Sequence, residues 1–349
     1  MTLTEISYYA RKMLPFLVLI VLIFLIFFYA LKLFFLYFQL NRPKPLSINP
    51  IFNKISQPKI SGASSSAGLN FTLDTIEGEP VTATETAKIY FLPESTSRFG
   101  IREKAYLIAK TFGFDTTVIK HNLVNDSSYV FNDDKQNLSI DITNFNFKYI
   151  YQFASDKNLF DNTRIPAKGE IEEKATSFLK QINRYPEELA QGKSNIIYLR
   201  YDPLYKRLSV AARPQDANVV EIDFYRPDID GFSTVSPTYF NSQNSMIMVF
   251  HADDFKILKA QVQFFEKSDE QVGIYPVKTG SQAWNDLKTG KGIVVSSSNS
   301  FKNIIIQKMF YGYFDPDFYQ EYLQPVYIFL GDGNFVGYVS AITADYLTE

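Results

Sequence analysis

Three short motifs in this chain contain the residue types that serine-based acyl transfer requires, and they occur in the required order. They are Ser177-x-x-Lys180, Ser242-x-Asn244 and Lys278-Thr-Gly. In this chemistry a neighbouring base activates the serine, because an unassisted hydroxyl is a weak nucleophile. The activated oxygen attacks a carbonyl carbon and forms an ester intermediate. An enzyme that transfers acyl groups through a serine is therefore one function to weigh against the rest of the sequence.

This order of motifs is typical of penicillin-binding enzymes. Against that function, Ser-x-x-Lys occurs a second time, from Ser56 to Lys59, as often as chance predicts. Ser177 is expected in the middle of a helix, whereas an activated nucleophile usually lies at a helix start beside its base. Lys278 is expected to lead into a helix and not to continue an edge strand. We therefore predict that the chain is not an enzyme. Two alternatives stay open: a membrane-anchored cell-wall enzyme of penicillin-binding type, with Ser177 and Lys180, and a structural subunit of an envelope assembly.

Few residues suggest a metal site. His121 and His251 are far apart in sequence and have no partner at ligand spacing. Asp228-Ile-Asp230-Gly resembles the start of a calcium loop, but no glutamate stands at position 12 of that loop. Asp315 belongs to an Asp-Pro-Asp sequence that is typical of a turn. We predict no cofactor, and a surface cation near Asp228, Asp230 or Asp315 stays open.

The distribution of charge argues against nucleic acid as a partner. Of the 35 basic and 37 acidic residues, seven basic residues and one acidic residue lie within residues 1–68. The remainder therefore has 28 basic and 36 acidic residues and a net charge of −8. Binding to phosphates requires clustered lysine and arginine. The partners that fit are membrane lipid, next to the basic N-terminal stretch, and another envelope or membrane protein.

A long apolar run lies near the N-terminus. Residues 13–31 are 19 uncharged, almost entirely apolar positions, and after Lys32 the run continues to residue 40. A helix of about 20 such residues spans a bilayer core of roughly 30 Å. The run is too long for a cleavable signal peptide, and no Ala-x-Ala pattern follows it. We predict a tail over residues 1–12, a single transmembrane helix over residues 13–40, and a linker rich in proline and serine over residues 41–68.

The charges beside this run leave its orientation open. Arg11 and Lys12 precede it, and Lys32, Arg42 and Lys44 interrupt or follow it. Read literally, the positive-inside rule places the C-terminal side in the cytoplasm. Long domains, however, translocate largely regardless of charge.

From residue 69 onward the sequence predicts an α+β body. Short alternating runs of aromatic and polar residues are typical of strands. Helical patterns cover residues 102–112, 170–184 and 281–289. For the third helix, Ser281 is the expected N-cap and Gly290 the expected stop.

The first two of these helices share a pattern of Glu-Lys-Ala-x-x-apolar-x-Lys at an offset of 70 residues. Strands and tight turns follow each helix. This favours a unit of one helix and an antiparallel meander that is used up to three times, although two unrelated amphipathic helices would share such a pattern by chance. The predicted modules cover residues 69–160, 161–265 and 266–349.

The last module resembles a known group of proteins. The matching segments are Gly280-Ser-Gln-Ala-Trp284-Asn-Asp-Leu287, Tyr311-Gly-Tyr-Phe-Asp315, Tyr322-Leu-Gln-Pro325-Val-Tyr327-Ile-Phe329 and Phe335-Val-Gly-Tyr338-Val-Ser-Ala-Ile342. They resemble the extracytoplasmic modules of YycH/YycI-type regulators and the wider PepSY-like group. The resemblance implies a bacterial single-pass membrane protein without catalytic residues, which modulates a sensor kinase or a peptidase. It also implies a cytoplasmic N-terminus and an extracytoplasmic body.

The matching residues suggest packing and not chemistry. We expect five of them to be structural anchors: Trp284, Leu287, Pro325, Tyr327 and Tyr338. Trp284 and Leu287 share one helix face and would close one side of the sheet. Pro325 is expected to open a strand, where its missing N–H costs no ladder hydrogen bond.

Overall fold

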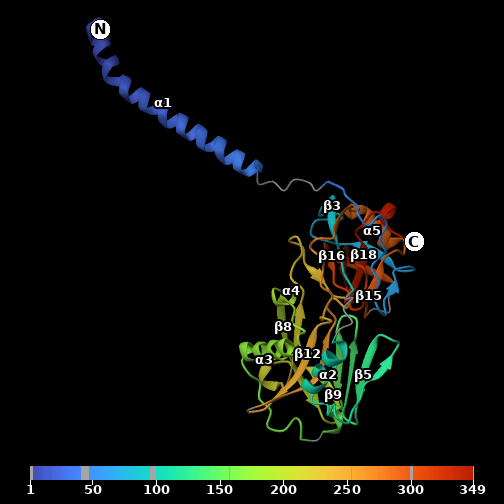
Figure 1. Ribbon diagram of the computed structural model, residues 1–349. Helices are drawn as coiled ribbons and strands as arrows, with labels where there is room; N and C mark the ends of the chain where they lie inside the picture. The colour runs from blue at the N-terminus through green and yellow to red at the C-terminus, as the bar shows by residue number, and fades with distance from the viewer. Residues whose placement is uncertain are drawn as a thin grey trace. The chain divides into compact units, whose positions relative to one another are not determined.

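The computed structural model describes residues 3–40, 47–94, 100–156, 158–252, 254–298 and 302–348. The chain divides into two compact units, Met1–Leu46 and Ser47–Glu349 (Figure 1). The prediction of a mixed helix-and-sheet body that follows an apolar N-terminal helix is confirmed.

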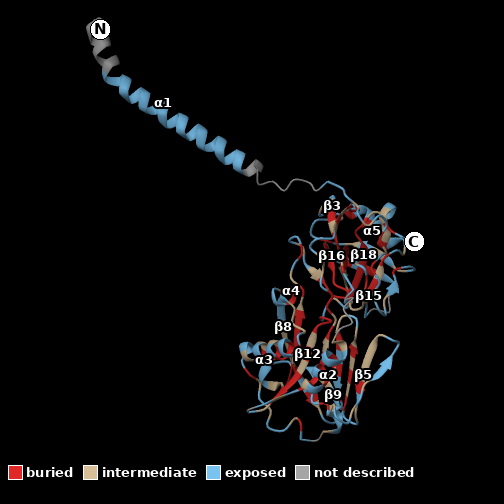
Figure 2. Ribbon diagram, in the orientation of Figure 1, coloured by how far each residue is buried: buried red, intermediate tan, exposed pale blue. Residues whose placement is uncertain are grey.

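The described part of the first unit is helix α1 (Leu3–Leu40). Its segment Lys12–Tyr37 has a mean hydropathy of 3.0 and no buried residue, and Figure 2 shows this segment exposed along its length. Twenty-six helical residues extend about 39 Å, so α1 is long and apolar enough to cross a membrane. A helix that is apolar on every face is suited to lipid and not to water.

The second unit contains two β-sheets. The first, called here the composite sheet, combines described strands from both ends of the unit with the short strand β11 from its middle. Its strands are β1 (Ser64–Ser65), β2 (Asn70–Leu73), β3 (Thr86–Phe91), β11 (Thr234–Val235), β14 (Val272–Pro276), β15 (Ile293–Ser296), β16 (Asn303–Phe314), β17 (Tyr322–Gly331) and β18 (Phe335–Ser340). The main order is β1-β15-β18-β17-β16-β11, while β2 pairs with β16 and β3 pairs with β14 and β17. Helix α5 (Gly280–Lys288) packs against β18.

The second sheet, called here the inserted sheet, comes from the chain between β3 and β14. Its strands are β4 (Asn122–Val124), β5 (Ser128–Asn132), β6 (Gln136–Asp141), β7 (Phe147–Tyr151), β8 (Lys193–Asp202), β9 (Arg207–Val210), β10 (Val219–Tyr225), β12 (Ser245–Phe250) and β13 (Phe255–Val262). The order is β4-β5-β6-β7-β13-β12-β10-β8-β9, with every described pairing antiparallel. The two halves of the sheet therefore meet where β7 pairs with β13.

Helices α2 (Ile101–Thr111) and α3 (Lys168–Gln181) share one hydrophobic core on the inserted sheet. Positions 70 residues apart are buried alike. Ala105 matches Ala175 and Ala109 matches Leu179 within the helices, and Phe112 matches Ile182 directly after them. The residues that end the helices match as well, because Gly113 (φ 91°) and Asn183 (φ 54°) both adopt the left-handed conformation. The sequence offset of 70 residues thus relates residues with matching burial along the two helices. A short helix, α4 (Glu187–Ala190), follows α3.

The predicted linker over residues 41–68 is too long. Residues 47–68 belong to the second unit, in which Ile55 and Ser66 are fully buried. Ile55 forms a bridge with Leu347, and β1 pairs with β15. The prolines here exclude a helix but not extended backbone at a sheet edge. Residues 41–46 lie outside the described part of the chain.

The three predicted modules are not arranged as separate bodies. Residues 70–91, assigned to the first module, supply β2 and β3 of the composite sheet, next to strands of the last module. The remainder of the first module and the second module share one sheet and one core. Local periodicity predicts where the strands lie, but it does not predict the long-range pairing that assigns each strand to a sheet.

The expected cap of α5 is wrong by two residues. Thr279, and not Ser281, is the N-cap, and it forms a capping box with Gln282. The Thr279 hydroxyl accepts from the backbone N–H of Gln282 at 3.2 Å, and the Gln282 side chain accepts from the backbone N–H of Thr279 at 2.8 Å. Gly290 ends the helix with φ 85°, as expected.

The expected structural anchors lie around α5 and β17. Trp284 packs near Phe329. Leu287 is fully buried and lies against Gly337, since a Cβ added to that glycine would be 3.3 Å from Cδ1 of Leu287. Pro325 is the fourth residue of β17 and does not open it. It lies where the neighbour on one side of β17 changes from β3 to β18, which explains how a proline is tolerated inside the strand.

The two tyrosine anchors, Tyr327 and Tyr338, have fully buried side chains. Their hydroxyls donate to the backbone oxygens of Lys278 and Ser236, each at 2.8 Å. A buried hydroxyl with a partner fixes the position of its ring. The two side chains therefore attach β17 and β18 to neighbouring loops.

Candidate functional site

A groove of about 580 Å³ lies between α2 and α3 on the inserted sheet. This volume is within the usual range for ligand sites. Two helices and strands from both halves of the sheet line it. The lining residues are Leu107, Lys110, Thr111, Phe112, Tyr149, Phe178, Gln181, Phe255, Lys256 and Ile257.

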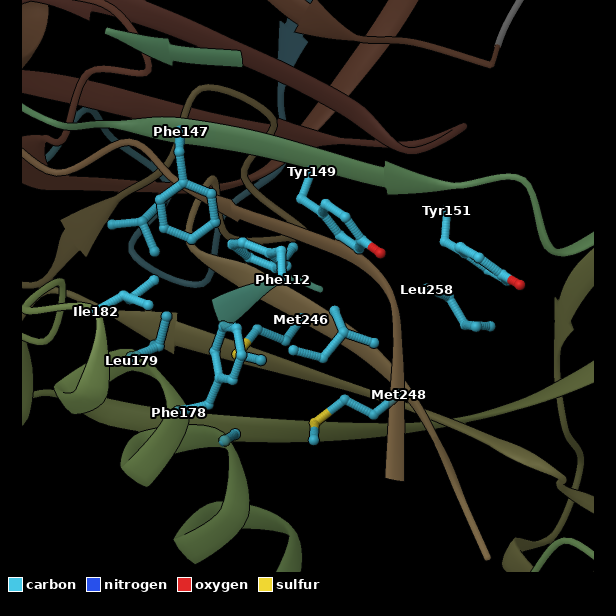
Figure 3. Packing of buried hydrophobic residues seen from close by; sticks show 14 of the residues in the cluster. Phe112, Phe147, Tyr149, Tyr151, Phe178, Leu179, Ile182, Met246, Met248 and Leu258 are labelled. Atoms are coloured by element: carbon cyan, nitrogen blue, oxygen red, sulfur yellow. The ribbon is translucent and has the colours of Figure 1, made fainter. Parts of the chain in front are cut away.

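Aromatic rings form the floor of the groove. The ring centroid of Phe112 lies 4.2 Å from that of Tyr149 in a stacked arrangement and 4.9 Å from that of Phe178 in an edge-to-face arrangement. Figure 3 shows the three side chains in the same cluster. The Tyr149 hydroxyl donates to Oε1 of Gln136 at 2.8 Å, and burial raises the pKa of this tyrosine. Aromatic pairs in such geometry have a well-defined arrangement, so the floor is preformed.

The helix ends explain why the groove forms here. Thr111 and Gln181 are the last residues of α2 and α3, and they stand 70 residues apart at matched positions. The chain turns away from the sheet through the left-handed residues Gly113 and Asn183. The groove therefore lies beside the ends of the two helices, where β7 pairs with β13.

The rim of the groove is basic. Lys110 and Lys256 are exposed, and Nζ of Lys256 lies 4.3 Å from the centroid of the Tyr151 ring. Among the described residues, the lining of this groove contains no aspartate or glutamate. Leu107 adds an apolar side chain that is 51% exposed. The groove thus offers two cations beside an apolar floor.

The acyl-transfer motifs do not lie together. Ser177 and Lys180 are on the exposed side of α3 and do not line the groove, and Nζ of Lys180 lies 5.7 Å from the Tyr185 ring. Lys278 follows β14 of the composite sheet, where its Nζ pairs with Asp286 at 3.0 Å and donates to the backbone oxygen of Ser340.

The middle motif has structural hydrogen bonds. The hydroxyl of Ser242 donates to the backbone oxygen of Phe224 at 2.5 Å, and Oδ1 of Asn244 accepts from the backbone N–H of Gln263 at 2.9 Å. Both residues are buried. They fix the connection into β12 and do not reach the exposed face of α3.

All three aspartates considered for a surface cation have a cationic side chain as a partner. Asp230 accepts from Nζ of Lys88 at 2.7 Å and from the Tyr90 hydroxyl at 2.9 Å, whereas Asp228 is 3.9 Å from Nζ of Lys193. Asp315 is not on the surface, because its side chain is buried against an arginine. Within the described residues, no group of three His, Cys, Asp or Glu side chains is suited to hold a metal ion.

The two histidines are parts of local packing. Nδ1 of His121 lies 3.0 Å from the Tyr106 hydroxyl, and its ring stacks on Tyr129 at 3.9 Å. Burial, followed by the charge of Arg102, lowers the pKa of His121. Nε2 of His251 lies 3.2 Å from the backbone oxygen of Leu159.

A buried ionic cluster joins the two sheets. Arg226, at the end of β10, donates from Nε to Asp315 at 2.8 Å, from Nη1 to Glu188 at 2.6 Å, and from Nη2 to the backbone oxygen of Phe265 at 2.5 Å. Its guanidinium lies 4.1 Å from the centroid of the Phe264 ring. The sequence did not reveal this cluster, because Arg226 and Asp315 are 89 residues apart and the Asp-Pro-Asp sequence around Asp315 indicates only a turn.

A smaller hollow of about 300 Å³ lies on the strands β7, β10, β12 and β13. Glu221 lines it, together with Lys259 and Lys148. Burial, and then the charge of Asp223, raises the pKa of Glu221 to about 7, although Lys259 acts in the opposite direction. This carboxyl therefore titrates near neutral pH.

No family model and no curated protein matches this chain. Among solved structures, it is similar to an uncharacterized protein from Eubacterium rectale ATCC 33656, whose crystal structure has a resolution of 1.45 Å. The two sequences are 14% identical, and the alignment covers 78% of this chain and 89% of that chain with a TM-score of 0.37. A similarity at this TM-score carries no argument about function.

Proposed function

We propose that this chain is a non-enzymatic, single-pass membrane protein whose body binds and regulates another membrane protein. The observation that carries the proposal is the preformed groove between α2 and α3, which combines an aromatic floor with a basic rim. A groove of this composition suits recognition, and the groups that line it do not include a nucleophile paired with a base.

Helix α1 supports the membrane part of the proposal. The span Lys12–Tyr37 can hold the body at a bilayer. The acidic body and the absence of clustered basic motifs favour a protein partner over nucleic acid. The resemblance to YycH/YycI-type and PepSY-like modules adds the expectation of a sensor kinase or a peptidase as that partner, and of a body outside the cytoplasm.

Orientation is tested by single cysteines, because the natural chain contains none. Leu204→Cys places a thiol at a position that is 80% exposed in the body, and Thr4→Cys places one near the N-terminus. In intact cells, a membrane-impermeant maleimide should label Leu204→Cys and should label Thr4→Cys only after permeabilisation. The reverse pattern contradicts an extracytoplasmic body.

The partner is tested by crosslinking the full chain in native membranes, followed by purification and mass spectrometry. We expect one membrane protein to be captured in a fixed ratio. A preparation that is monodisperse and captures no membrane protein contradicts the proposal. In parallel, acylation of Ser177 by a β-lactam probe, with Ser177→Ala as the control, would establish the enzymatic alternative instead.

A further inference from the structure

The groove between α2 and α3 is basic in a body that is acidic. Residues 69–349 have a net charge of −8, yet the ionisable groups that line the groove, apart from Tyr149, are Lys110 and Lys256. Both ammonium groups are on exposed residues and belong to different elements, α2 and β13. Charges of one sign in a cleft attract the opposite sign, so the ligand is anionic at two separate points.

The floor between these lysines is apolar. Phe112 and Phe178 are buried in the core beneath the groove, while Leu107 is half exposed at its edge. An apolar group that covers Leu107 removes the exposed part of that side chain from water, which is favourable. A ligand that is anionic throughout would leave this surface uncovered.

Gln181 adds a side-chain amide that can both donate and accept a hydrogen bond. Its side chain is exposed at the end of α3. A backbone amide offers the complementary acceptor and donor. A simple fatty acid offers no such pair.

From these three observations we infer that the groove binds an extended peptide segment of the partner, in which carboxylate side chains flank an apolar side chain. The apolar side chain covers Leu107 and the Phe178 ring, and the carboxylates pair with Lys110 and Lys256. This inference rests on the proposed function, since it names what the body recognises.

The test uses the full chain in nanodiscs of uncharged lipid and a dye-labelled peptide, acetyl-Asp-Glu-Phe-Leu-Glu-Asp-amide, measured by fluorescence polarisation. A matched peptide has Asn and Gln in place of Asp and Glu. We expect the acidic peptide to bind at least about tenfold more tightly, because hydrogen bonds to charged groups are the stronger class. Equal binding of the two peptides overturns the inference.

The variants separate the groove from general electrostatics. The double variant Lys110→Gln/Lys256→Gln should lose the tenfold preference. The control Lys104→Gln/Lys180→Gln removes the same charge from exposed positions outside the groove, and Lys180 is the matched position of Lys110 at the offset of 70 residues. An equal loss in the control overturns the inference, as does binding of sodium dodecanoate without binding of the acidic peptide.

The crosslinking experiment distinguishes this inference from the proposed function. If Lys110→Gln/Lys256→Gln still captures the membrane partner as well as the natural chain does, the groove is not the contact and the proposed function stands. If the natural chain captures no partner, the proposed function itself fails.

Discussion

Nε of Arg226 lies 2.8 Å from Oδ1 of Asp315, and this contact connects the end of β10 in the inserted sheet with the end of β16 in the composite sheet. Both side chains are buried. Gln243 donates to the other oxygen of Asp315 at 2.7 Å, and Glu188 accepts a second hydrogen bond from Arg226. The chain also passes between the sheets after β3, β10, β11 and β13. The two sheets are therefore joined by four backbone crossings and by a buried ionic cluster.

Arg226→Met should destabilise the body strongly. The substitution leaves the carboxylate of Asp315 buried without its cation, which costs about 3–5 kcal/mol. Urea unfolding of the full chain in detergent, followed by circular dichroism, measures this loss. Arg213→Met removes an exposed pair with Asp216 and should cost less than about 1 kcal/mol. Comparable losses in the two variants would show that the buried cluster is not the joint described here.

Glu221→Gln should change how stability depends on pH. Because the pKa of Glu221 rises from its usual 4.5 to about 7 in the folded protein, the folded state binds more protons than the unfolded state between these values. The contribution of Glu221 to stability is therefore complete below pH 4.5 and is lost as the pH rises toward 7. Glu221 is only partly buried, so we expect the free energy of unfolding of Glu221→Gln to exceed that of the natural chain by about 1 kcal/mol at pH 8 and to equal it at pH 4.

Unfolding curves at pH 4, 6 and 8 check this expectation. Glu173→Gln, on the exposed side of α3, is the control and should show the same pH dependence as the natural chain. If Glu221→Gln is as pH-dependent as the control, Lys259 and Lys148 neutralise the carboxylate more effectively than burial destabilises it.

The elements of this fold were largely predictable from sequence, but their partners were not. The apolar run, the helices α2 and α3, and the hairpin between β17 and β18 depend on local patterns, and the positive φ of Gly333 and Asn334 is typical of a two-residue hairpin turn. In contrast, β2 is four residues long, and nothing in Asn70–Leu73 specifies a parallel partner at residue 303. The groove was missed for the same reason, because α2, α3, β7 and β13 each contribute only a few residues to it.

Substitutions at the two helix ends test the equivalence of α2 and α3. Gly113→Ala and Asn183→Ala each force an alanine into the left-handed conformation and should each destabilise the protein by about 1 kcal/mol. Gly169→Ala, in the first turn of α3 with open space around it, should instead stabilise by about 0.5 kcal/mol. Thermal unfolding distinguishes the two expected losses of stability from the expected gain. A neutral Asn183→Ala would mean that the second helix does not end as the first does.

The cap of α5 supplies a separate test. Thr279→Ala removes a hydroxyl that accepts from Gln282 and should cost about 1 kcal/mol. Ser281→Ala should be neutral within about 0.5 kcal/mol, because Ser281 lies inside the helix and is exposed. Urea unfolding of the two variants decides between them, and the opposite ranking would restore Ser281 as the cap.

The pairing of β2 with β16 has a consequence for the order of synthesis. Nδ2 of Asn70 donates to Oδ1 of Asn303 at 3.0 Å, across 233 residues of chain. At about 5–20 residues per second, β16 leaves the ribosome roughly 10–50 s after β2. During that interval the last strand of the inserted sheet, β13, is synthesised, so that sheet can fold. Phe71 and Leu73 of β2 are not yet paired with β16 at this stage. The first strands of the body to be synthesised are thus among the last to pair. Until they pair, their exposed edges make the nascent chain prone to aggregation.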